Sequence, residues 1–110
     1  MAFKLAKKPT FISRVKVFTP NSKGGHDKSE FNGTFKLVSD MEELEDLRSL
    51  PQREVMERVL VGWNEFVDDD GNEIEFNEVT LQALLSDARA LSGLRLAFWS
   101  NILKAPEKNV

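Results

Sequence analysis

The stretch that decides the fold is VGWNEFVDDDGNEIEF, Val61–Phe76, which leads directly into a long helical pattern. Residues 61–67 carry strand-forming side chains, and the cluster 69–72 (Asp-Asp-Gly-Asn) is typical of a turn in which Gly71 supplies a positive φ. Side chains alternate in 73–76, so this segment can pair back onto 61–67. The sequence therefore predicts a hairpin with strands at about 61–67 and 73–76.

Two helices are predicted after this hairpin, at about 78–86 and 88–104. Asn77 is expected to cap the first, because its side-chain oxygen can accept a hydrogen bond from an unpaired amide of the first turn. Phe76 and Leu81 are spaced as a hydrophobic staple across that cap. The pair Ser86-Asp87 offers a cap for the last helix, which Gly93 weakens by about 1 kcal/mol relative to alanine.

The last helix carries apolar side chains on two sides. One stripe is formed by Leu91, Leu94, Phe98 and Ile102. The second stripe is formed by Leu96, Trp99 and Leu103. Such a helix either lies centrally in the core or presents one face to another chain, and tryptophan is common in both settings. Both readings stay open, and the second stripe supplies the candidate partner-binding residues.

The N-terminal half is expected to hold two strands, at about 11–18 and 31–38. The polar segment 20–28, with its Gly24-Gly25 pair, predicts a flexible loop between them. Val15 and Val17 share one face of the first strand. The apolar face of the second strand is formed by Phe31, Phe35 and Leu37. These faces need to be covered by helix.

Two further helices are predicted at about 40–49 and 52–60. Ser39 is expected to cap the first in a capping-box pattern, and Pro51 separates the two. The buried stripe of the first helix is predicted as Met41, Leu44 and Leu47. The buried stripe of the second is predicted as Val55, Met56, Val59 and Leu60. With the strands, these helices predict an α+β fold.

Composition limits the classes of function. The 110 residues predict one domain, 1–110, with a flexible arm at 1–10 and a tail at 105–110. The net charge of −3 leaves no basic footprint for nucleic acid, and the chain has no apolar run of transmembrane length or signal-peptide character. With no cysteine and a single histidine, thiolate chemistry and a His-rich metal site are excluded.

Two motifs resemble parts of a calcium site or a catalytic site. Asp68, Asp70 and Asn72 match the first ligand positions of an EF-hand loop, but the positions that require glycine and glutamate hold Glu73 and Val79. A solvated turn is therefore favoured over a calcium site. His26 is alone in a Gly-rich loop without a nucleophile elbow. The sequence thus predicts no catalytic residues, no metal site and no cofactor.

The order of these features resembles the tail assembly chaperones of bacteriophages with long flexible tails. The resemblance rests on Val61-Gly62-Trp63, the acidic turn 68–71, the apolar segment ending in Phe76, and the capped helix with Leu81, Leu84 and Leu85. It covers roughly 55–110 and, more loosely, the two N-terminal strands. In the family a proline often follows the Leu-Leu-x-Asp segment, where this chain has Ala88.

The resemblance implies a protein that is not an enzyme. Members bind the tape measure protein, keep its apolar helical segments soluble and help to recruit tail tube protein around it. They self-associate, act in the host cell cytoplasm and are absent from the mature virion. A longer form made by ribosomal frameshifting is common and could carry the contact with the tube. The alternative function is a small structural tail or head-completion protein of the virion.

Overall fold

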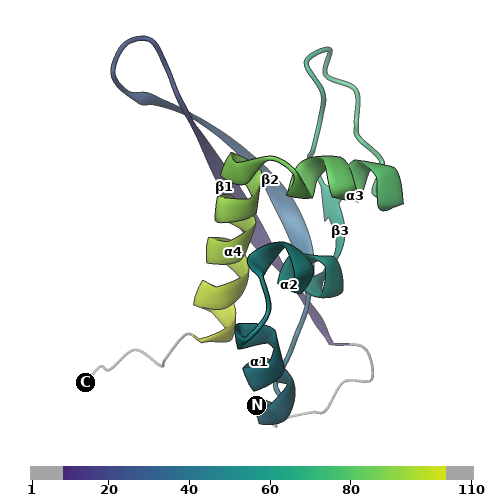
Figure 1. Ribbon diagram of the computed structural model, residues 1–110. Helices are drawn as coiled ribbons and strands as arrows, with labels where there is room; N and C mark the ends of the chain where they lie inside the picture. The colour runs from purple at the N-terminus through teal and green to yellow at the C-terminus, as the bar shows by residue number, and fades with distance from the viewer. Residues whose placement is uncertain (1–8, 104–110) are drawn as a thin grey trace, which may run out of the picture.

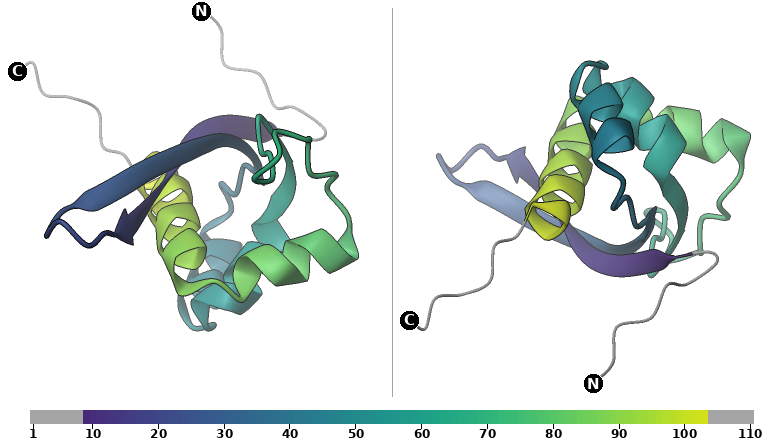
Figure 2. Two further views of the ribbon diagram at one scale, coloured as in Figure 1. Left: turned by 90° about the horizontal axis from the view of Figure 1, so that it is seen from above. Right: turned by 90° about the horizontal axis from the view of Figure 1, so that it is seen from below.

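The computed structural model describes residues 9–103, which form a three-stranded antiparallel sheet and four helices, an α+β fold as predicted. The strands, in sheet order, are β1 (Thr10–Pro20), β2 (His26–Lys36) and β3 (Leu60–Asn64). The helices are α1 (Met41–Arg48), α2 (Gln52–Val59), α3 (Glu78–Leu85) and α4 (Ala88–Ile102) (Figure 1). The helices lie on one side of the sheet, and α4 packs against β1 (Figure 2).

Strands β1 and β2 form a longer ribbon than the predicted segments 11–18 and 31–38. They pair from Thr10↔Lys36 to Pro20↔His26, so the flexible loop expected over 20–28 is a turn of only a few residues. The Asn21 side chain closes this turn by accepting hydrogen bonds from the amides of Lys23 and Gly25, and Gly24 takes a φ of 82°. A closed turn of this kind lets both strands continue to its edges.

The predicted hairpin of 61–67 with 73–76 is wrong as a pair of strands. Strand β3 ends at Asn64, and the only ladder contact between the two segments, within the described chain, is the single bridge Val67↔Glu73. The physical reason is Glu65, whose φ of 59° turns the chain out of the extended conformation. The segment is instead a loop held by two hydrogen bonds. The Ile74 amide donates to the Phe66 carbonyl at 2.8 Å, and the Trp63 indole N–H donates to the Ile74 carbonyl at 2.8 Å.

The four predicted helices are confirmed, with ends within two residues of those expected. Asn77 caps α3 and Asp87 caps α4 through side-chain oxygens, as predicted. The prediction that Ser39 caps α1 is wrong, because the Asp40 carboxylate accepts the Glu43 amide instead. With the cap at Asp40, Met41 becomes the first helical residue and points to solvent, 65% exposed, so its predicted burial is also wrong.

The core lies between the sheet and the helices. Its centre is formed by the fully buried side chains Val15, Phe35, Val55, Met56, Leu94 and Phe98. Phe11 stacks on Phe35 with ring centroids 5.4 Å apart, and both rings approach Phe98. Beside them, Trp63 packs edge-on against Phe31, Phe66 and Phe76. Trp63 therefore anchors the loop after β3 to the core.

Several sequence expectations fall at the edges of the described chain. The predicted arm 1–10 lies mostly, and the predicted tail 105–110 wholly, outside the described residues. The part of the arm that is described belongs to the sheet, because Thr10 begins β1 and the Pro9 carbonyl accepts the Leu37 amide. Leu37 itself follows β2 and is 42% exposed, so its expected place on the buried face is wrong. None of the helices in the described range is long and apolar enough to span a bilayer.

Candidate partner-binding surface of the last helix

Helix α4 lies directly against β1, and Gly93 makes this approach possible. A Cβ atom at position 93 would lie 2.4 Å from the Lys16 carbonyl oxygen and 3.3 Å from a Val15 methyl carbon. Only a residue without a side chain fits there. The glycine that weakens the helix pattern in the sequence is therefore the point at which the helix backbone meets the strand.

The first apolar stripe of α4 faces the core. Leu94 and Phe98 are fully buried, and Leu91 and Ile102 pack against the core while remaining partly accessible. Ala90 and Ala97 are buried beside them. This stripe holds the helix on the sheet. Because it fixes the rotation of the helix about its axis, it also determines the direction in which the second stripe points.

The structure divides the three predicted partner-binding residues into two kinds. Leu96 is 64% exposed and Leu103 is 49% exposed, so both project apolar surface from α4 into solvent. Trp99 is half-buried: its ring lies edge-on to Phe98 at 5.0 Å, and its indole N–H donates to the Gln52 side-chain oxygen at 2.9 Å. Trp99 thus ties α4 to α2, and the outward apolar surface consists of Leu96 and Leu103.

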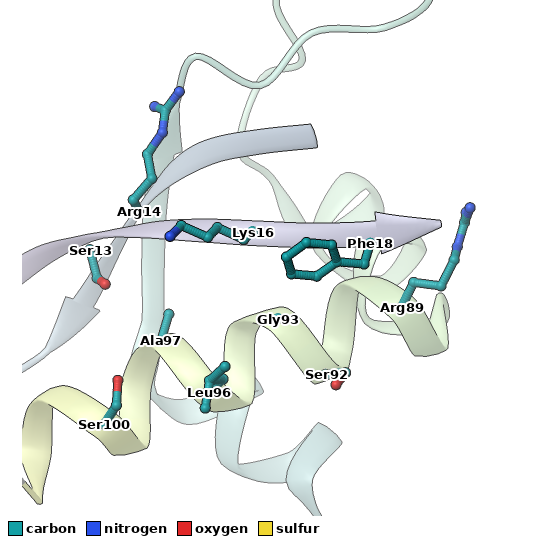
Figure 3. A pocket seen from close by; sticks show the side chains of 10 residues that line it. All are labelled: Ser13, Arg14, Lys16, Phe18, Arg89, Ser92, Gly93, Leu96, Ala97 and Ser100. Atoms are coloured by element: carbon teal, nitrogen blue, oxygen red, sulfur yellow. The ribbon is translucent and has the colours of Figure 1, made fainter. Parts of the chain in front are cut away.

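A groove of about 370 Å³ runs between α4 and β1, and Leu96 forms part of it (Figure 3). Its other large apolar side chain is Phe18 of β1, which is 50% exposed. The remaining lining residues are Ser13, Arg14, Lys16, Arg89, Ser92, Gly93, Ala97 and Ser100. The groove therefore combines apolar surface with three cationic side chains and hydroxyl groups, and none of the described residues that line it carries a carboxylate.

The cations of the groove differ in their partners. Arg14 bonds to Asn32 at 3.1 Å and to Glu65 at 3.3 Å, and it lies 3.8 Å from Glu30. Lys16 is exposed and forms no ion pair with any residue that the structure describes. Of the three, Lys16 is the cation most available to a partner.

Arg89 forms an ion pair with Asp87 at the start of α4. This guanidinium hydrogen-bonds the carboxylate and lowers the pKa of Asp87 to about 2. Arg89 also donates to the Thr19 hydroxyl at 2.9 Å, which joins the first turn of α4 to the end of β1. Arg89 therefore fixes one end of the groove while adding positive charge to it.

The acidic turn and His26 lie at exposed positions. The Asp68 carboxylate accepts the amides of Asp70 and Asn72 and so shapes its own turn. His26 is exposed at the start of β2. Within residues 9–103 no group of three or more His, Asp or Glu side chains converges as metal ligands would.

Among the residues that line the groove, only Leu96 was predicted to bind a partner. Arg14, Lys16 and Phe18 alternate with the inward-facing valines, and this pattern indicates that they point outward. What the pattern could not supply is that a helix some 80 residues later lies alongside them. No protein-family model, curated protein or solved structure matches the chain.

Proposed function

We propose that the protein is a tail assembly chaperone of a bacteriophage with a long flexible tail. It binds the tape measure protein, keeps it soluble and promotes assembly of the tail tube. Support comes from the sequence resemblance and from one structural observation: Leu96 and Leu103 are exposed, while Leu94 and Phe98 of the other stripe of α4 are fully buried in the core. Exposed apolar side chains on a rigid helix suit the apolar helical segments of a client.

The proposal is tested by co-expression with the candidate tape measure protein. The soluble fraction of the tape measure protein is measured with the wild-type chain, with Leu96→Asp and with Leu103→Asp. Both substitutions put a charge on the exposed surface without opening the core, so the chain should stay folded. The soluble fraction of the tape measure protein should fall. Trp99→Asp is less informative, because Trp99 also packs on Phe98.

Met41→Asp is the matched control. Met41 is as exposed as Leu96, at 65%, but lies on α1, and aspartate is well tolerated in the first turn of a helix. Equal client solubility with all four chains would contradict the proposal. Finding the protein in purified virions would favour the alternative, a structural tail or head-completion protein.

A further inference from the structure

We infer that copies of this chain associate head to tail, with the α4–β1 groove of one copy holding the acidic loop 65–78 of the next. The inference rests on the proposed function, because self-association is what the sequence resemblance behind that function implies, and it specifies which two surfaces meet. It does not depend on the identity of the client.

The first observation is that charge is strongly segregated along the chain. Residues 10–28, which form β1 and the turn into β2, contain four basic side chains and one acidic one. The loop and helix start at 65–78 contain seven acidic side chains and no basic one. The net charge of −3 therefore combines a basic segment, of which Arg14 and Lys16 line the groove, with an acidic segment at 65–78.

The second observation is that most carboxylates of the acidic loop have no ion-pair partner among residues 9–103. The ion pairs among the described residues use the carboxylates of Glu30, Glu43, Glu65 and Asp87. Asp69, Asp70, Glu73 and Glu75 are exposed and take part in none of them. These carboxylates are available to the cations of another molecule.

The third observation is that both surfaces also expose large apolar side chains. The groove presents Phe18 and Leu96; the acidic segment contains Val67, 48% exposed, and is followed directly by Val79, 79% exposed. Charge complementarity steers two surfaces together and fixes their register, while apolar contact supplies affinity. The two surfaces match in both respects.

Within one copy the loop reaches the groove lining through Glu65, which accepts a hydrogen bond from Arg14 at 3.3 Å, while Asp69 and Asp70 at the loop tip form no ion pair with the described residues of the groove. The β1–β2 ribbon projects from one side of the molecule and the loop after β3 lies toward the other, in both views of Figure 2. Different patches that meet across an interface form a heterologous contact, which continues into rings or open chains. Association should therefore grow with concentration and extend beyond a dimer.

The test uses sedimentation velocity on the purified full chain and two charge-reversed variants. Lys16→Glu reverses the available cation of the groove. Asp69→Lys with Asp70→Lys reverses the tip of the loop, where neither side chain makes a hydrogen bond within the described structure. Each variant alone should associate at least about tenfold more weakly than wild type, because like charges then face each other.

Mixing the two variants gives the decisive result. The reversed groove of one then faces the reversed loop of the other, and both native surfaces also find each other, so the mixture should recover association. About 1 M salt should weaken the wild-type oligomer, because it shortens the screening length to about 3 Å. Arg95→Glu, on α4 but outside the groove, and Glu45→Lys with Asp46→Lys, on α1, are the matched controls and should associate as wild type does.

Three outcomes would overturn the inference: a monomeric wild-type chain at every concentration, variants that associate like wild type, or a mixture that stays dissociated. An acidic segment of the tape measure protein could occupy the groove instead. In that case Lys16→Glu would reduce client solubility without changing the oligomeric state. Failure of the proposed function is distinguishable, because it appears as wild-type chain that leaves the tape measure protein insoluble.

Discussion

Replacing Gly93 with alanine sets helix propensity against tertiary packing. On propensity alone, Gly93→Ala should stabilise the 15-residue helix α4 by about 1 kcal/mol. In the fold, the added methyl carbon would lie 2.4 Å from the Lys16 carbonyl oxygen, more than 1 Å inside ordinary van der Waals contact. The obstacle is a backbone atom, so it cannot rotate away, and α4 must shift off β1.

Overpacking of this kind costs about 1–3 kcal/mol. We expect Gly93→Ala to lower the free energy of unfolding by about that amount, and the melting temperature by roughly 4 °C for each kcal/mol. Urea unfolding followed by tryptophan fluorescence and far-UV circular dichroism measures the change. Ser92→Ala, at the exposed neighbouring position, is the control and should stabilise slightly. A Gly93→Ala chain at least as stable as wild type would refute the close approach of α4 to β1.

Three further predictions concern the caps and the core. Asn77→Ala should cost about 1 kcal/mol in urea unfolding, because it removes the acceptor for the Thr80 amide, whereas Asn77→Asp should cost much less. The pKa of Asp87 falls from 3.8 to about 2 on folding, so its contribution to stability is present above pH 3.8 and is lost as the pH falls toward 2. Asp87→Asn keeps an acceptor for the cap but does not titrate. The unfolding free energy of this variant should therefore decrease less than that of wild type between pH 3.8 and about pH 2. Phe98→Ala should lower the free energy of unfolding by about 3–5 kcal/mol because the ring is fully buried. Phe18→Ala, at a half-exposed ring, should lower it by under about 1 kcal/mol. Similar losses for the two variants would contradict the assigned burial.

The helices could be predicted from the sequence because their signals are local. Asn77 and Asp87 act within their own first turns, and the stripe of Leu94 and Phe98 follows from the helical period alone. Ser39 failed as a cap for a related reason. Two adjacent residues could both accept the hydrogen bond, and the chain uses Asp40.

The remaining errors come from contacts that no local pattern contains. Glu65 occupies the left-handed region that glycine and asparagine favour, and it is held there by Asn32 at 2.7 Å and Arg14 at 3.3 Å, residues of other strands. From the sequence alone, Gly93 is a residue that destabilises a helix. Only the fold shows that the Lys16 carbonyl lies beside it and leaves no room for a side chain. The groove needs residues from both ends of the chain, so only the fold brings its two sides together.

The central claim is that the outward apolar surface of α4 holds other chains. The most direct measurement is a methyl NMR spectrum of the full chain, labelled at leucine, valine and methionine, with and without a helical segment of the tape measure protein. The Leu96 and Leu103 methyl signals should shift on binding, while the methyl signal of Met41, which is about as exposed as Leu96 but lies on α1, should stay in place. Unchanged Leu96 and Leu103 signals in the presence of a bound segment would contradict the account.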